Sequence, residues 1–284
     1  MLPLTPVAIV TDSAAGIPSE LLAAYAISVV SFHVRVGERT YRDGIDIQPA
    51  AFFRLLRQQS EPDVSTGVPS LEALLEVYQR CASWARSIVS IHLAGAQSAM
   101  CDAARSAAAE SPIPVVVVDS GSTAMGEGFV ALEAARAAQQ GADLDAVVRR
   151  AHEVACNVGL YALLESVTYA VKGGRLARAA RLLGTFLNIH PLVRVADNAV
   201  DLIGQVRRRS QGIAQLIEKI AQQAGDRPVH LTIHYAEDEG EARDVLARLQ
   251  QRLKCVEAYL TPVPVALGAH AGPGSLGIAY YVEM

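Results

Sequence analysis

The feature that most constrains the fold is a unit that recurs three times: a short, apolar, β-branched run, then polar residues, then a helical segment. The runs cover residues 7–10, 87–91 and 115–118, and the helical segments that follow cover 19–25, 97–109 and 128–140. Buried strands that alternate with helices in this way are typical of a parallel sheet covered by helices. The first half of the chain is therefore predicted to be an α/β structure with a mostly parallel sheet flanked by helices.

The pattern changes after residue 156. Two short apolar runs flank Ala196-Asp-Asn-Ala199, which is typical of a β-hairpin. Later elements are expected as helices at 213–223 and 239–253 and strands at 229–235, 255–261 and 276–282. A chain of 284 residues commonly forms two domains. We predict an N-terminal α/β domain at 1–157 and a C-terminal α/β domain with a mixed sheet at 158–284.

Composition and charge exclude several classes of protein. Hydrophobic residues make up 51% of the chain and the net charge is -4, so the chain should be ordered and should not attract nucleic acid. The four cysteines lie far apart and form no ligand cluster, so no metal site or other cofactor is predicted. No signal peptide is recognisable, and no apolar run approaches the roughly 20 residues of a membrane span. We expect a cytoplasmic protein without an integral membrane segment.

Polar and glycine residues that a core does not require gather in five segments between the expected elements. They are Thr11-Asp12-Ser13, Ser65-Thr-Gly-Val-Pro-Ser70, Asp119-Ser120-Gly-Ser122, Lys172-Gly-Gly-Arg175 and His270-Ala-Gly272-Pro-Gly274-Ser-Leu-Gly277. In open α/β sheets, ligands bind at the carboxyl ends of strands, where such loops converge. These segments are the candidate ligand loops.

Asp12 has two interpretations. As a phosphatase nucleophile or a magnesium ligand it would need a second carboxylate close by, and its sequence neighbours offer none. Helix capping or a hydrogen bond at the end of the sheet is the plainer alternative. Asp119 and Ser120 likewise either orient a ligand or cap the helix that follows.

Thr66 and His270 are stronger ligand candidates. Thr66 lies in a Gly/Pro loop with no helix of its own, whereas Ser70 is explained as a helix N-cap. His270 lies in a Gly/Pro-rich loop rather than on an apolar helix face, which favours a hydrogen bond to a ligand. The basic residues are ambiguous, since Arg175 and Arg207 could face an anion or remain solvated.

Taken in order, these segments resemble the DegV family. The resemblance is carried by Thr11-Asp12-Ser13, Thr66-Gly-Val-Pro-Ser70, Asp119-Ser120, Gly173-Gly-Arg175 and His270-x-Gly272-Pro-Gly274-x-x-Gly277, and it spans essentially the whole chain. The family's Ser-Gly-Thr at the start of the helix after the third strand reads Ala94-Gly95-Ala96 here. A family carboxylate-binding serine is therefore predicted to be absent, with the Gly95 amide, Ser90 or His92 in its place.

The resemblance implies a function. DegV proteins have two α/β domains with a fatty acid between them, and many deliver it to a separate ATP-dependent fatty-acid kinase. No catalytic residue is known in the carrier. The resemblance places Thr66 and His270 at the carboxyl group, and Arg175 and Arg207 near the head group or the partner.

Two functions follow. The first is a non-catalytic carrier that buries a long-chain fatty acid and presents its carboxyl group to the kinase, with Ser13 and the glycines Gly272 and Gly274 in the ligand loops. The alternative is a phosphotransferase or hydrolase for a small carboxylated or phosphorylated substrate, using Asp12, Ser13 or His270. The absence of a nucleotide loop, a Gly-x-Ser-x-Gly motif and a zinc-protease motif favours the carrier.

Overall fold

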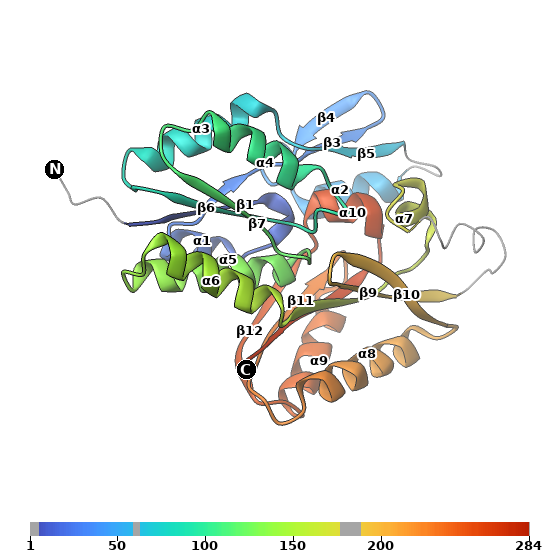
Figure 1. The fold of residues 1–284 in the computed structure, drawn as a ribbon. Helices are drawn as coiled ribbons and strands as arrows, with labels where there is room; N and C mark the ends of the chain where they lie inside the picture. The colour runs from blue at the N-terminus through green and yellow to red at the C-terminus, as the bar shows by residue number, and fades with distance from the viewer. Residues whose placement is uncertain (1–5, 59–62, 177–188, 284) are drawn as a thin grey trace.

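The computed structural model describes residues 6–58, 63–176 and 189–283. Figure 1 shows two α/β layers stacked on each other, with α5 and α6 lying between the parallel sheet of the first half and the mixed sheet of the second. The α/β class, with a parallel N-terminal sheet and a mixed C-terminal sheet, is confirmed. The boundary between residues 157 and 158 remains a prediction. None of the helices in the described ranges has the length and apolar character to cross a membrane.

The parallel sheet has the order β2-β1-β6-β7. Its strands are β1 (Ala8–Asp12), β2 (Ser28–Val30), β6 (Ile88–His92) and β7 (Val115–Asp119). Its helices are α1 (Ser19–Ala24), α3 (Leu71–Ala82), α4 (Met100–Ala109), α5 (Met125–Gln139) and α6 (Leu144–Ala155), with the short 3-10 turn η1 (Ser13–Ala15) after β1. Side chains start two of these helices, since Ser70 accepts from the Ala73 amide and Asp143 from the Ala146 amide.

A small antiparallel sheet of order β4-β3-β5 lies at one side of the first half. It consists of β3 (His33–Val36), β4 (Arg39–Arg42) and β5 (Val64–Gly67), and α2 (Pro49–Arg57) precedes β5. Thr66 therefore lies in a strand, paired with Val34 of β3, and the expectation of a loop at this position is wrong. The segment is too short and too rich in small residues to show a strand period in sequence.

The second sheet has the order β10-β9-β8-β13-β11-β12. Its strands are β8 (Val158–Leu163), β9 (His190–Ala196), β10 (Ala199–Val206), β11 (Val229–Tyr235), β12 (Cys255–Pro262) and β13 (Leu276–Val282). Only β11 and β12 pair in parallel, and the predicted hairpin of β9 and β10 is confirmed. Its helices are α7 (Thr168–Lys172), α8 (Arg209–Ala224), α9 (Glu239–Gln250) and α10 (Val265–Ala271). Figure 1 shows α8 and α9 on the face away from α5.

Helix α10 was not expected, and it carries His270. It begins after Pro264, and its first two amides, those of Val265 and Ala266, donate to the carboxylate of Asp43 at 3.2 and 3.0 Å. The helix is therefore capped by a residue 222 positions earlier in the chain rather than by its own neighbours. His270 lies in its last turn, so the expected Gly/Pro loop is wrong at this position.

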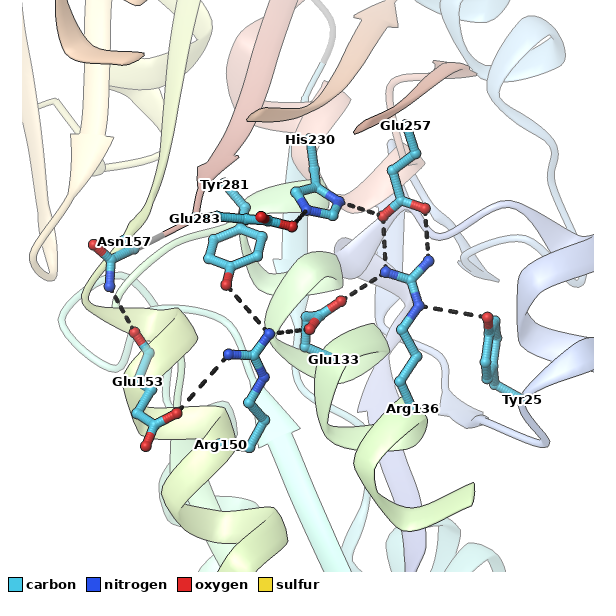
Figure 2. Close-up of polar contacts among 10 residues, drawn as sticks. All are labelled: Tyr25, Glu133, Arg136, Arg150, Glu153, Asn157, His230, Glu257, Tyr281 and Glu283. Carbon is cyan, nitrogen blue, oxygen red and sulfur yellow. Dashed lines mark hydrogen bonds and ion pairs between the residues drawn. The ribbon is translucent and has the colours of Figure 1, made fainter. Parts of the chain in front are cut away.

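The two halves share a hydrophobic core around α5. Eleven successive residues of this helix, Met125–Ala135, are buried, which is typical of a helix that packs on several sides. One buried cluster joins Ile9 of β1 and Phe129 of α5 to Leu160 of β8 and Ala279 of β13. A cluster of charged side chains, drawn in Figure 2, also links α5 and α6 to β11, β12 and β13. The halves are thus held together by both apolar and ionic contacts.

Candidate functional site

An apolar cavity of about 150 Å³ lies between the two halves. Its walls come from β8, β9, β10, β11, β13 and α10 on one side, and from the segments that follow β1, β6 and β7 on the other. One water-sized group needs about 10–15 Å³ by this kind of measure, so the cavity has room for on the order of ten such groups. An apolar space of this size suits a hydrocarbon chain.

The polar end of this cavity brings together three of the predicted residues: Thr66, His270 and Arg175. Thr66 Oγ1 lies 2.9 Å from His270 Nε2. The Arg175 guanidinium donates to the Gln97 and Gly173 carbonyl oxygens at 3.1 and 2.6 Å, but it makes no ion pair with the described residues. Its positive charge is therefore available to an anion in the cavity.

Burial sets the charge state of this end. Burial and, to a smaller extent, the nearby Arg175 charge together lower the pKa of His270 to about 4, so the imidazole is neutral near pH 7. Burial also lowers the pKa of Arg175, yet a guanidinium stays protonated at any ordinary pH. The site thus presents one cation, one hydroxyl and one neutral imidazole, which is a suitable set for a single carboxylate.

Gly173 packs against the Nδ1 edge of the His270 imidazole, whereas Thr66 contacts Nε2. A Cβ atom built on Gly173 would lie 2.1 Å from His270 Nδ1, and this nitrogen is buried without a hydrogen-bond partner among the described residues. His270 is therefore held by contact on one side and by Thr66 on the other. The Gly-Gly-Arg turn places Arg175 and leaves room for the histidine at the same time.

Ser98 also lines the cavity and was not predicted. Helix α4 begins at Met100, and Ser98 Oγ accepts from the Met100 amide at 3.2 Å. A hydroxyl is therefore present near the start of this helix, four residues after Ala94, while the absence of the family serine at Ala94 stays a prediction. The expected helix start at residue 97 was too early, because no side chain caps Ala99 and the Ala-rich segment gives no sharp signal.

Several other predicted residues hold loops rather than line the cavity. Ser13 Oγ donates to Asp43 at 3.0 Å and so supports the cap of α10. Asp119 accepts from the Gly95 amide at 3.1 Å and from the Gly121 amide at 2.8 Å, so the Gly95 amide is already used. The Ser120 hydroxyl donates to the Ser122 carbonyl oxygen. These residues fix the loops that follow β1, β6 and β7.

Gly272 and Gly274 are required by the turn that follows α10. Their φ angles are +76° and +70°, and a Cβ at Gly272 would lie 2.4 Å from the Tyr169 ring. The Gly274 amide donates to Glu237 at 2.9 Å. The turn leads into Ser275 and Leu276, both of which line the cavity.

A buried chain of hydrogen bonds connects Asp12, His92 and Ser90. The Tyr78 hydroxyl donates to Ser90 Oγ at 2.9 Å, Ser90 Oγ lies 2.7 Å from His92 Nε2, and His92 Nδ1 lies 3.0 Å from Asp12 Oδ2. Ser90 and His92 have no exposed surface. The order of groups is that of a serine-hydrolase triad, but Ser90 lines neither the apolar cavity, nor the polar cavity beside Arg209, nor the one beside Asp12.

Glu127, on the first turn of α5, lies beside this chain and was also missed. It is fully buried, one oxygen accepts from Thr11 Oγ1 at 3.0 Å, and the other has no partner among the described residues. Burial, reinforced by the charge of Asp12, raises the pKa of Glu127 well above its ordinary value. The fold therefore supplies the second carboxylate that the sequence around Asp12 lacks.

Arg207 lies apart from Thr66 and His270. It is exposed and lines a separate polar cavity together with Arg57, Arg209 and Glu237. It makes no hydrogen bond or ion pair with the described residues, whereas Arg209 is bound to Glu241. Ser275 and Leu276 line both cavities, so Arg207 lies on the far side of the turn that closes the apolar one.

A family model described as "Uncharacterised protein, DegV family" matches residues 6–283. The chain belongs to the DegV family. A DegV domain-containing protein of Streptomyces coelicolor is 36% identical over 274 residues, which is 96% of this chain and 97% of the relative. A DegV domain-containing protein of Mycobacterium tuberculosis is 34% identical over 275 residues, covering 96% of each.

Solved structures of DegV proteins have the same fold. A structure from Thermus thermophilus, described as fatty acid binding of a DegV family protein, superposes with a TM-score of 0.88 at 27% identity. It covers 98% of this chain and 100% of its own. This DegV chain therefore shares the arrangement of both halves with a relative described as binding a fatty acid.

Proposed function

We propose that this DegV protein binds one long-chain fatty acid, with the acyl chain in the apolar cavity and the carboxylate at its polar end. The observation that carries the proposal is the guanidinium of Arg175, which makes no ion pair with the described residues and lies beside Thr66 and His270 at one end of a mostly apolar cavity. The Thermus relative, described as binding a fatty acid, supports it.

The two parts of the cavity contribute differently to binding. Each buried CH₂ group contributes about 0.8 kcal/mol, so the chain supplies most of the affinity. Burying a carboxylate without partners would cost several kcal/mol of binding free energy. The carboxylate must therefore bind where a cation and hydroxyl donors are already in place. Arg175 supplies the charge, Thr66 and Ser98 supply hydroxyl hydrogen bonds, and His270 orients the Thr66 hydroxyl through Nε2.

Extraction of the purified protein under denaturing conditions tests the proposal. We expect mass spectrometry to find about one fatty acid per chain, carried through purification. A chain stripped of lipid should rebind a long-chain fatty acid and lose affinity steeply as the acyl chain is shortened, because each methylene contributes about 0.8 kcal/mol. Protein without bound lipid that also fails to rebind a fatty acid after stripping would refute the proposal.

Replacing Thr66 by Val should weaken fatty-acid binding roughly 10- to 100-fold. The change keeps the shape of the side chain but removes a hydroxyl hydrogen bond to a charged group, which is worth about 1.5–3 kcal/mol. Titration of stripped protein measures the affinity, and Thr66→Ser is the matched control because it keeps the hydroxyl. Equal affinities of the wild type and Thr66→Val, at an unchanged melting temperature, would remove Thr66 from the site.

We further propose that the carboxylate is presented to an ATP-dependent fatty-acid kinase, and that the protein itself has no catalytic residue. Arg207 supports this as an exposed guanidinium, unpaired among the described residues, on the far side of the turn from the cavity. A cytoplasmic location fits such a partner and remains a prediction from the sequence.

Replacing Arg207 by Ala should slow acyl-phosphate production by a kinase partner more than it weakens fatty-acid binding. The physical reason is that Arg207 faces solvent and lines a different cavity from Thr66 and His270. Parallel assays of binding and of coupled phosphorylation give the comparison, with Arg243→Ala on α9 as an exposed control. A loss of similar size in both assays would place Arg207 at the carboxylate.

The hydrolase or phosphotransferase alternative finds one supporting feature, the Ser90–His92–Asp12 chain. A nucleophilic serine must reach its substrate, and Ser90 is fully buried with its oxygen accepting from Tyr78. The arrangement therefore favours a structural role for the chain. Turnover of simple acyl or phosphate esters that is abolished by Ser90→Ala, in a variant that remains folded, would favour the enzyme.

A further inference from the structure

The buried residues Asp12, His92 and Glu127 have no task in fatty-acid binding. They come from three elements, the end of β1, the end of β6 and the first turn of α5. One potential ligand atom from each lies within 4.8 Å of the other two. We propose that these three side chains bind one divalent transition-metal ion, of which Zn²⁺ is the first candidate.

The topology places this cluster where α/β folds bind ligands. The sheet order β2-β1-β6-β7 means that the chain leaves β1 toward β2 on one side, while β6 and β7 lie on the other. The carboxyl ends of β1 and β6 therefore flank the point where the strand order reverses, and ligands in such sheets bind there. Asp12 ends β1 and His92 ends β6.

The charges of the cluster need to be balanced, either by a proton or by a bound cation. Asp12 and Glu127 are 1% and 0% exposed, and no Lys or Arg pairs with either carboxylate among the described residues. Two facing carboxylates cannot both be ionised in such a place without a counter-charge. One oxygen of Glu127 is buried without a partner, which leaves it free to act as a ligand.

The surroundings of His92 suit a metal ligand. A bound imidazole normally donates its second N–H to an oxygen that holds the ring in place. His92 Nε2 lies 2.7 Å from Ser90 Oγ, which is itself held by Tyr78, and Nδ1 faces Asp12. Metal-bound His92 would carry its proton on Nε2 and offer Nδ1 to the ion.

The donor set indicates the kind of ion. One imidazole and two carboxylates suit Zn²⁺ or a similar transition metal, whereas Ca²⁺ and Mg²⁺ prefer oxygen alone. Tetrahedral Zn²⁺ keeps its ligand atoms roughly 3.4 Å apart, so small side-chain shifts would close the site. A surface cavity lined by Thr11, Asp12 and Ser13 lies beside Asp12, one of the three residues of the cluster.

Metal content of the untagged full chain tests the proposal. Protein produced with zinc in the medium and dialysed against a weak chelator should retain about one Zn²⁺ per chain. Glu127→Gln should retain less than a tenth of that, while its circular dichroism shows a folded protein. Added Zn²⁺ should raise the melting temperature of the wild type and not of Glu127→Gln.

A surface site must be separated from this one. His152 and Cys156 lie four residues apart near the end of α6 and could capture zinc adventitiously. Cys156→Ala should therefore keep its zinc, and the Co²⁺ form should show bands of N/O coordination without a thiolate charge-transfer band. Three results would each overturn the proposal: wild-type protein without zinc, zinc that persists in Glu127→Gln, or zinc that is lost in Cys156→Ala. Wild-type protein without zinc would show that a proton on Glu127 balances the cluster.

Discussion

Replacing Gly173 by Ala should reduce fatty-acid affinity at least tenfold, although the change adds only one methyl group. The new Cβ would lie 2.1 Å from His270 Nδ1, 2.7 Å from its Cε1 atom and 3.2 Å from the Tyr169 carbonyl oxygen. The φ angle of Gly173 is -77°, which alanine adopts without strain, so the whole effect comes from the collision. The His270 imidazole must then rotate away from residue 173, and it loses its hydrogen bond with Thr66. Titration of stripped protein with a fatty acid measures the loss.

Two controls separate this effect from general damage. Gly174→Asn changes the neighbouring residue, whose φ is +77° and whose Cβ position is open, so asparagine should be tolerated and the affinity retained. In a His270→Ala background, Gly173→Ala should cost little more, because the group that it displaces is gone. Additive losses in the double variant would mean that Gly173 acts independently of His270.

Replacing Arg136 by Met should give the largest loss of stability among the charged residues of Figure 2, about 2–3 kcal/mol. Arg136 donates to Glu257 at 2.9 and 2.6 Å and to Glu133 at 2.6 Å, and its guanidinium lies 5.6 Å from the centre of the Tyr25 ring. Its removal leaves two largely buried carboxylates without their shared cation. The side chain is 24% exposed, so the cost falls below the 3–5 kcal/mol of a fully buried pair. Thermal unfolding should show a decrease of roughly 5–10 °C.

The pH dependence gives an independent check on this network. Burial alone would raise the pKa of Glu257, but hydrogen bonds from His230, Arg136 and Tyr259 outweigh it and lower the pKa to about 2. A carboxyl with a lowered pKa stabilises the fold above its ordinary pKa and loses this contribution as the pH falls toward 2. The difference between the wild type and Arg136→Met should therefore shrink on acidification below about pH 4.5.

Arg243→Met is the matched control for Arg136, because it removes an ion pair whose side chains are 68% and 44% exposed. Its melting temperature should change by less than about 2 °C. Similar losses in both variants, or a pH-independent loss in Arg136→Met, would show that the network does not hold the halves together.

The sequence was informative where structure depends on local pattern. The βαβ units, the hairpin and the strand 276–282 follow from short-range periodicity and turn residues, and each is found in the structure. Thr66, His270 and Arg175 were identified because they interrupt such patterns and match a family motif, and they line one cavity.

The sequence was uninformative where structure depends on distant residues. Helix α10 is capped by Asp43, and Glu127 meets Asp12 only because α5 packs against β1, so neither could be recognised from neighbours. Ser98 was overlooked because the start of an Ala-rich helix has no clear boundary signal. Ser90, expected as a substitute ligand, is engaged with Tyr78 and His92, which are contacts that only the folded sheet creates.

The strand order of the second sheet has a consequence for how the protein is made. Strand β13 lies between β8 and β11, although it follows both of them, and β12 as well, in sequence. The pieces β8-β9-β10 and β11-β12 have no strand pairing with each other except through β13, so the sheet stays in two parts until β13 has been made. Pairing over such long separations is slow and leaves strand edges open meanwhile. Leu276 and Gly277 of β13 line the apolar cavity, so the cavity is complete only after this late strand has been made, and a ligand held there cannot guide the earlier steps of folding.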